Sequence, residues 1–150
     1  MSAIGQPFPD FSLADQDGNI HTLSSFAGAP VVFYFYPKDD TSGCTTEACE
    51  FRNEIPNLGN IRVVGVSPDP VKSHRKFADK YELNFTLLAD PDKTLLEATG
   101  VWVEKSMYGK KYMGVERTTV AVDAQGIVTH VWNKVKPAGH AAAVQAALKA

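Results

Sequence analysis

The sequence predicts an α/β fold with a mixed central sheet and helices on both of its faces. Residues 31–36 and 61–66 form apolar, β-branched and aromatic runs, which are typical of strands buried on both faces. Each run is followed by a helical pattern, at 41–56 and at 71–81. Two strand-like segments joined by a short turn come late in the chain, and such a pair adds antiparallel strands to the sheet.

The N-terminal segment predicts a β-hairpin. Residues 8–13 and 20–23 alternate loosely between apolar and polar side chains, and Asp17-Gly18 supplies a turn between them. Residues 24–29 are expected to form a short turn of helix before the first buried strand. That strand is preceded by Pro30 and stopped by Pro37.

The middle of the chain continues the alternation of strands and helices. The strand at 61–66 ends before Pro68, and Pro70 stands where a helix can begin. One face of that helix, 71–81, is apolar, and we expect His74 on this face to be a half-buried packing residue. A strand at 85–89 and a helix at 92–99, ended by Gly100, follow.

The C-terminal part predicts a strand at 115–122, a turn at 123–126, an antiparallel strand at 127–132 and a closing helix at 139–148. Residues 101–114 contain aromatic residues, glycine and lysine. This stretch is either a wall of a site or an ordinary core-and-loop segment. Its charged side chains are expected to be solvated: Glu104, Lys105, Lys110 and Lys111.

Size and composition limit the possible functions. With 150 residues, 44% of them apolar and 21% charged, the chain is expected to form one domain over 1–150. The net charge of −2 gives no electrostatic reason to bind nucleic acid or a membrane surface. No apolar run is long enough to span a bilayer, and the first residues lack the pattern of a signal peptide. We therefore expect a cytoplasmic protein.

Two cysteines stand close together, and one of them opens a helix. Cys44 lies in the first predicted turn, where unpaired N–H groups and the helix dipole stabilise a thiolate. Cys49 comes five residues later. In a reducing cytosol such a pair is redox-active or metal-binding. The four histidines have no ligand spacing with either cysteine, so we expect neither a metal nor another cofactor.

The residues around Cys44 resemble the active-site signature of the peroxiredoxins, in the pattern Pro37-x-x-x-Thr41-x-x-Cys44. The second cysteine at position 49 is similar to the bacterioferritin-comigratory, or PrxQ, branch of that family. The resemblance covers most of the chain, from the motif GxPxPDF at 5–11 to the segment GVERTT at 114–119. One departure is Ser42, where the family often has proline, although serine can also begin a helix. The resemblance implies a thioredoxin-like fold, which agrees with the predicted order of elements.

The resemblance implies a role for each residue of this constellation. Cys44 would attack the peroxide as a thiolate and become a sulfenic acid. Arg117 would stabilise the thiolate and the leaving oxygen, and Thr41 would hold the peroxide through its hydroxyl. Pro37 would shield the sulfur from water, and Glu47 would hold the arginine in place. Taken singly, each residue has an ordinary alternative. Cys44 could be a small buried thiol and Arg117 a surface charge. Thr41 and Pro37 could be ordinary loop residues, and Glu47 a glutamate that favours the helix dipole.

The resemblance also implies that Cys49 resolves the sulfenic acid by closing an intramolecular disulfide with Cys44. On one α-helix, five residues correspond to a rise of roughly 7.5 Å and a rotation of about 140°. A disulfide needs Cα atoms at most about 7 Å apart and Cβ atoms that face each other. We therefore hypothesise that the first turns of the helix unwind in each cycle. The alternative for Cys49 is a buried helix residue beside Phe51.

The expected function is a thiol peroxidase that reduces hydrogen peroxide and organic hydroperoxides, with thioredoxin or a similar dithiol protein as its reductant. The chain has no C-x-x-C pair with which it could easily reduce itself. Two alternatives stay open. One is a thioredoxin-like thiol–disulfide carrier, although the spacing here is C-x-x-x-x-C; the other is a redox-sensing module without catalysis. The branch that the chain resembles is often monomeric, so we expect a monomer or a weak homodimer.

Overall fold

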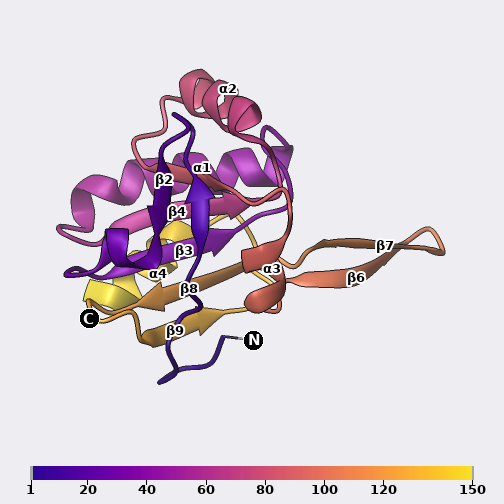
Figure 1. Cartoon of the computed structure of the whole chain (residues 1–150). Helices are drawn as coiled ribbons and strands as arrows, with labels where there is room; N and C mark the ends of the chain where they lie inside the picture. Colours follow the sequence, from indigo (N-terminus) through magenta and orange to yellow (C-terminus); the bar gives the residue numbers. More distant parts are fainter. Residues whose placement is uncertain (1, 150) are drawn as a thin grey trace.

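A seven-stranded mixed sheet forms the centre of the protein, with the strand order β2-β1-β5-β4-β3-β8-β9 (Figure 1). The structure, a computed structural model, describes residues 2–149, so both ends of the predicted domain 1–150 lie outside the described part. The strands of this sheet are β1 Ser12–Ala14, β2 Ile20–Thr22, β3 Val31–Phe35, β4 Arg62–Ser67, β5 Thr86–Ala89, β8 Thr118–Val122 and β9 Val128–Trp132.

Strand β3 leads into the loop that carries Cys44, and all five of its residues are buried. It pairs in parallel with β4 and antiparallel with β8, while β4 pairs in parallel with β5. The hairpin β1–β2 and the strand β9 complete the sheet with antiparallel pairs. The predicted buried strands, the N-terminal hairpin and the mixed sheet are therefore confirmed.

Helices cover both faces of the sheet, as the sequence predicts. α1 Ser42–Glu54, α2 Val71–Tyr81 and α4 His140–Lys149 pack on one face, over a buried cluster that includes Tyr34 and Phe77. The other face carries α3 Thr94–Ala98, the 3₁₀ helix η1 Leu23–Phe26 and the N-terminal segment, with Phe33 and Leu88 in its cluster. A second 3₁₀ helix, η2 Ile55–Asn57, follows α1 directly. Because side chains alternate along β3, neighbouring residues of this one strand supply both clusters.

Two expectations about residues 101–122 are wrong. The stretch 101–114 is not a core-and-loop segment but contains a hairpin, β6 Trp102–Met107 and β7 Lys110–Val115, which forms a sheet of its own and projects from the body (Figure 1). Its turn has positive φ at Tyr108 and Gly109, as a tight hairpin turn requires. The strand expected at 115–122 is interrupted at 116–117, and β8 begins at Thr118. Only the base of the arm, at Trp102 and Val115, packs on the core, so most of its sequence lacks the alternation that predicts a strand.

The expectation for His74 is also wrong. Its side chain is completely buried rather than half-buried. Both ring nitrogens lie within hydrogen-bond distance of oxygen atoms, one from Asp39 and one from the Leu88 carbonyl. The apolar neighbours in the helix pattern indicated burial but could not indicate these polar partners, which come from the loop after β3 and from β5.

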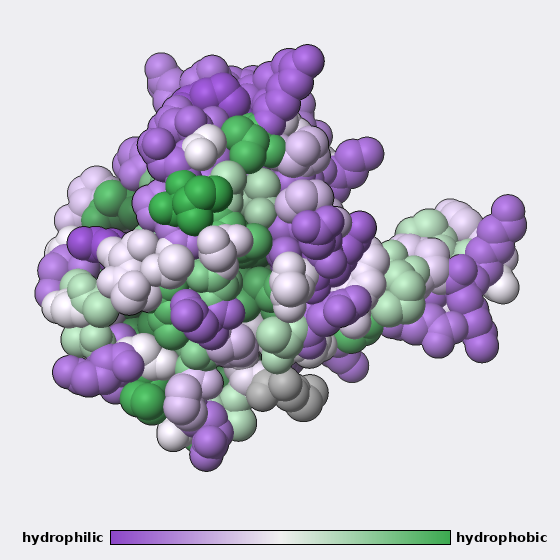
Figure 2. Space-filling view, in the orientation of Figure 1, coloured by the Kyte–Doolittle hydropathy of each residue, from purple (hydrophilic) through white to green (hydrophobic). Residues whose placement is uncertain are grey.

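The surface carries few large apolar side chains. Figure 2 shows the arm standing out from the body with polar and weakly apolar residues side by side along it. The large apolar residues that are exposed are Ile4 and Ile20 on the body and Met107, Tyr108, Tyr112 and Met113 on the arm. Among residues 2–149, no helix has the length and apolar character needed to cross a membrane.

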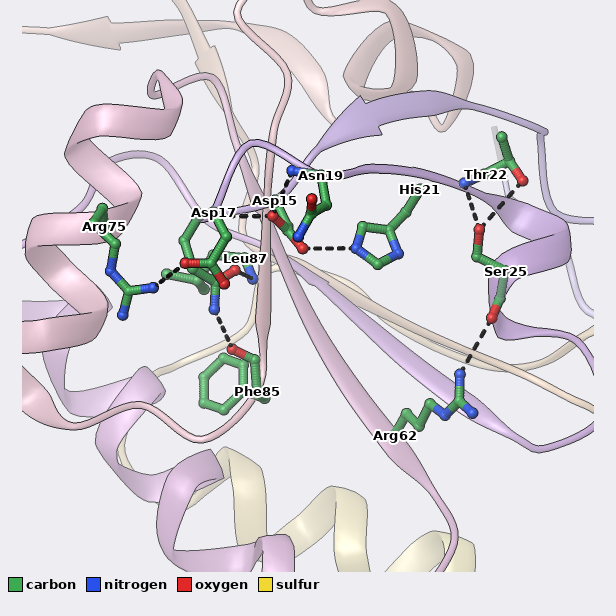
Figure 3. A network of polar contacts seen from close by, with 11 residues as sticks. Asp15, Asp17, Asn19, His21, Thr22, Ser25, Arg62, Arg75, Phe85 and Leu87 are labelled. Carbon is green, nitrogen blue, oxygen red and sulfur yellow. Dashed lines mark hydrogen bonds and ion pairs between the residues drawn. The ribbon is translucent and has the colours of Figure 1, made fainter.

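The N-terminal hairpin is fixed by a polar network (Figure 3). The Asp15 carboxylate accepts hydrogen bonds from the N–H groups of Asp17 and Asn19 and lies 2.7 Å from His21 Nε2. Burial alone would raise the pKa of Asp15, but the hydrogen bonds with His21 and these amides hold it below its ordinary value. Arg75 of α2 contacts the Asp17 carboxylate, so the turn of the hairpin is attached to a helix that also borders the Cys44 loop.

Candidate active site

Cys44 lies at the first turn of α1, immediately after the loop that leaves β3. The helix begins after Thr41, whose carbonyl accepts the Thr45 N–H at 2.8 Å. Thr41 has an extended backbone, as expected of a residue that precedes the first helical turn. The Cys44 side chain is 1% exposed, and its sulfur is therefore held in a fixed, largely dry position at the positive end of the helix.

Arg117 reaches the sulfur from the gap between β7 and β8. Its Nη2 lies 3.2 Å from Cys44 Sγ, and its Nη1 lies 2.6 Å from Glu47 Oε1. The register of the sheet explains this placement, because Thr118 pairs with Phe35 and so brings the start of β8 beside the end of β3. A residue distant in sequence is thus delivered to the loop by antiparallel pairing, with its guanidinium shared between the thiol and a carboxylate.

Glu47 is completely buried one turn after Cys44. Burial raises its pKa to about 7, although the charge of Arg117 and the hydrogen bond from it pull in the opposite direction. For Arg117 the balance is reversed: burial alone would lower its pKa, but Glu47 and Cys44 together raise it. Glu47 Oε2 has no hydrogen-bond partner among the described residues. The pair thus keeps one polar atom unsatisfied beside the reactive sulfur.

Thr41 and Pro37 lie at the two ends of the loop. The Thr41 hydroxyl donates to the Lys38 carbonyl at 2.9 Å, so within residues 2–149 its bond is to the loop and not to the sulfur. Its side chain is exposed, and Pro37 is half-buried where β3 ends. Thr41 and Pro37 are therefore close to Cys44 along the chain. The side chain that contacts the sulfur is that of Arg117, which also contacts Glu47.

Cys49 lies on the same uninterrupted helix as Cys44. Both thiols are free, Cys44 buried and Cys49 half-buried, and α1 runs without a break from Ser42 to Glu54. The helix is thus intact while both thiols are free.

The comparisons with known proteins agree on one family. The model of the AhpC/TSA family matches residues 4–131. The chain belongs to this family. A putative peroxiredoxin bcp of Coxiella burnetii is 49% identical over 143 residues, covering 94% of this chain and 95% of the relative. Peroxiredoxin Bcp of Bacillus subtilis is 44% identical over 148 residues, covering 97% and 94%.

Solved structures of peroxiredoxins have the same fold. A PrxQ mutant of Xylella fastidiosa superposes with a TM-score of 0.94 at 36% identity, covering 99% of this chain and 96% of that one. The bacterioferritin comigratory protein of Xanthomonas campestris superposes with a TM-score of 0.88 at 45% identity, covering 93% and 90%. The protein is therefore a peroxiredoxin of the Bcp/PrxQ group with a thioredoxin-like fold. Its activity is that of a thiol-dependent peroxidase, with a peroxide as substrate and a thiol as reductant.

The structure adds residues of this peroxiredoxin site that the sequence did not single out. Gly43 permits the approach of Arg117, since a Cβ at this position would lie 3.3 Å from Arg117 Nη2 and 3.2 Å from Pro137 Cγ. His140 Nε2 lies 2.7 Å from Thr119 Oγ1, and its pKa is lowered to about 4 by burial and by the charge of Arg117. No sequence pattern indicated either role, because both depend on segments that meet only in the folded chain.

Lys105 corrects the expectation that the charges of the arm are all solvated. It is half-buried, and burial, followed by the charge of Arg117, lowers its pKa. A Cβ on Gly114 would lie 3.3 Å from Lys105 Cδ, so this glycine, diagonally across the hairpin from Lys105, makes room for its aliphatic stem. The arm thus places a cation on the Arg117 side of the site.

Neither cysteine belongs to a cluster of metal-ligating side chains in the described part of the chain. One such cluster exists there, made of Asp39, Asp69 and His74, whose ligand atoms lie within 4.8 Å of one another. Hydrogen bonds inside the protein already occupy these atoms, so the cluster is a hydrogen-bonded network.

Proposed function

We propose that the Cys44 thiolate attacks one oxygen of hydrogen peroxide or of an organic hydroperoxide. An S–O bond forms, the O–O bond breaks, and the leaving hydroxide or alkoxide takes up a proton, which leaves Cys44 as a sulfenic acid. The observation that carries the proposal is the guanidinium of Arg117, 3.2 Å from the sulfur and 2.6 Å from a buried carboxylate. Donors fixed in this way stabilise the thiolate and the negative charge that develops on the leaving oxygen.

The other residues of the motif have positioning and binding roles in this proposal. Glu47 fixes the guanidinium, which can then donate to sulfur and to peroxide oxygens without reorienting. Thr41 offers its hydroxyl to the peroxide by leaving the Lys38 carbonyl, and Pro37 limits the access of water to the sulfur. The Xanthomonas campestris relative has alkyl peroxide reduction activity, which supports the inclusion of organic hydroperoxides.

In the second half of the proposed cycle the thiol of Cys49 attacks the sulfenic sulfur of Cys44. An S–S bond forms, the S–O bond breaks, and water leaves. Because the two residues are five positions apart on an intact helix, the first turns of α1 must unwind before the sulfurs can meet. Reduction of the disulfide needs two thiol equivalents from outside, because this chain has no third cysteine. From the resemblance to its family, we expect thioredoxin or a similar dithiol protein to supply them.

The proposed setting is the cytoplasm, with all 150 residues as one domain, a monomer or a weak homodimer, and no nucleic acid or membrane partner. The net charge of −2 supports the absence of a nucleic-acid or membrane partner. The two apolar clusters share one sheet, which supports a single domain. The few exposed apolar residues of the body are too scattered to indicate a large permanent interface.

The test is intact-mass analysis with disulfide mapping after one equivalent of hydrogen peroxide is added to the reduced protein. The proposal predicts a loss of two hydrogens and a Cys44–Cys49 link, and a trapped sulfenic acid on Cys44 in Cys49→Ser. If Cys44 stays reduced while a general oxidant still links the two cysteines, the peroxidase proposal fails. A thiol–disulfide carrier or a redox-sensing module would then explain the pair.

A further inference from the structure

A second buried ion pair lies close to Cys44 along the chain, and the proposed reaction does not use it. Asp39 Oδ2 is 2.6 Å from His74 Nδ1, with side-chain exposures of 3% and 0%. Asp39 belongs to the loop between β3 and α1, two residues before Thr41, while His74 belongs to α2. Burying two such groups is costly unless they are paired and fully hydrogen-bonded.

The hydrogen-bond partners of His74 favour one protonation state of its ring. Nε2 lies 2.9 Å from the Leu88 carbonyl oxygen, which can only accept, so this nitrogen carries a hydrogen. Nδ1 faces the Asp39 carboxylate, which already accepts from the hydroxyls of Tyr36 and Ser73. An ionised carboxylate with two hydroxyl donors in place is best satisfied by a third donor, and the imidazole then donates from both nitrogens. The arrangement of donors and acceptors thus favours an imidazolium at His74, paired with the Asp39 carboxylate.

The backbone of Asp39 is fixed as well. Its N–H donates to Asp69 Oδ2 at 2.7 Å, and the same oxygen accepts from the Ser67 hydroxyl at 2.8 Å. One residue of the loop is thus tied to the end of β4 and to α2 by side chain and main chain together. The neighbouring Asp40 instead holds Lys80 and Tyr81 at the exposed surface, where such contacts contribute little to stability.

We propose that Asp39, held by the His74 cation, is a positioning residue for the peroxidase reaction. It fixes the loop so that α1 begins directly after Thr41 and presents Cys44 to Arg117. The loop needs such an anchor because Ser42, the first helical residue, does not restrict its own φ as proline would. The inference rests on the proposed function only in taking Cys44 as the group that reacts with peroxide.

The protonation state can be measured directly on the unmodified protein. In ¹⁵N-detected NMR of the histidine rings at neutral pH, we expect both nitrogens of His74 to carry hydrogen. A neutral tautomer of His74, with one unprotonated nitrogen, would overturn the ion pair and with it the proposal. This measurement does not depend on whether any variant folds.

The positioning role predicts a loss of rate that a new constraint in the loop can repair. Asp39→Asn removes the charge at almost constant shape, and we expect Cys44 to react with hydrogen peroxide about tenfold more slowly. Proline at position 42 suits the first position of a helix, and Thr41 already has the extended backbone that must precede a proline. We therefore expect Ser42→Pro to restore most of the lost rate in Asp39→Asn and to change the parent protein little.

The controls separate positioning from stability and from the proposed function. Asp79→Asn, an exposed change on α2, should leave the rate unchanged. Rates are compared well below the melting temperature of every variant, and His74→Gln replaces Asp39→Asn if the latter does not fold. A lower melting temperature with an unchanged rate, or a slow rate that Ser42→Pro does not raise, would refute the positioning role. If Cys44 of the parent protein does not react with peroxide, the proposed function is refuted instead.

Discussion

Two buried ion pairs flank the start of α1, and they differ in how completely their polar atoms are paired. Around Asp39 and His74, both carboxylate oxygens and both ring nitrogens have partners. Around Glu47 and Arg117, one carboxylate oxygen has no partner among the described residues, and the guanidinium also contacts a thiol. A fully satisfied network fixes a conformation, whereas an incompletely satisfied one retains the capacity to bind or to exchange a proton. The Asp39–His74 pair is thus suited to hold the loop in place, and the Glu47–Arg117 pair is suited to take part in the reaction.

The largest effect should come from breaking the satisfied pair. His74→Leu leaves the Asp39 carboxylate buried without its cation, and we expect the free energy of unfolding to fall by about 3–5 kcal/mol. Urea denaturation followed by circular dichroism measures this change. Arg75→Leu, which breaks exposed ion pairs on the same helix, is the matched control and should cost far less. Equal losses in the two variants would mean that the buried Asp39–His74 pair contributes no more to stability than the exposed pairs of Arg75.

Breaking the unsatisfied pair should affect the reaction more than the fold. Arg117→Ala removes the donor closest to Cys44 Sγ, and we expect the rate of Cys44 oxidation by hydrogen peroxide to fall by about 10²–10³-fold. Stopped-flow competition with a reference peroxidase measures the rate, and Arg75→Ala should react like the parent. An unchanged rate in Arg117→Ala would favour the redox-sensing alternative over catalysis.

The pKa of Glu47 predicts a pH dependence of stability that further distinguishes the Glu47–Arg117 pair from the Asp39–His74 pair. Burial raises this pKa from 4.5 to about 7 in the folded protein, so the folded state binds a proton that the unfolded state releases. The free energy of unfolding should therefore fall as the pH rises from 4.5 to 7 and change no further from this group above 7. In Glu47→Gln this loss is absent. Between pH 4.5 and 7, we therefore expect the free energy of unfolding of the variant to rise by about 1–3 kcal/mol relative to that of the parent.

Denaturation of both proteins at several pH values between 4.5 and 8 tests the prediction. A stability difference that does not vary with pH would show that Glu47 is ionised throughout this interval. Glu54→Gln, a half-buried position on the same helix, provides the control: it keeps Glu47, so its stability should fall with pH as that of the parent does.

The smallest effect should come from the contact that lets Arg117 approach. In Gly43→Ala the new methyl group would lie 3.3 Å from Arg117 Nη2 and 3.2 Å from Pro137 Cγ, so one of the two must move. We expect Cys44 oxidation to slow by a few-fold, equivalent to about 1 kcal/mol. Thr46→Ala, an exposed change on the same helix, should not alter the rate. A Gly43→Ala variant as fast as the parent would show that Pro137 yields instead of the guanidinium.

Local sequence patterns were sufficient to predict the sheet, its helices and the reactive thiol. Continuous apolar runs indicated strands buried on both faces, and the helix from Val71 to Tyr81 was predictable to the residue because its apolar period matches one buried face. The placement of Cys44 at a helix N-terminus followed from the polar loop that precedes it. These features depend on residues close together in the chain, for which patterns of spacing carry the information.

The features that join distant segments became visible only in the folded chain. The sequence does not predict the arm from Trp102 to Val115, because beyond its base these strands bury no apolar face. The apolar pattern around His74 predicts a packing residue, because its polar partners come from other elements. Resemblance suggested that Arg117 and Glu47 act together, but the antiparallel register of β3 and β8 is what brings them together. Hydrogen bonds need two groups at one place, and spacing along a chain does not specify which distant groups will meet.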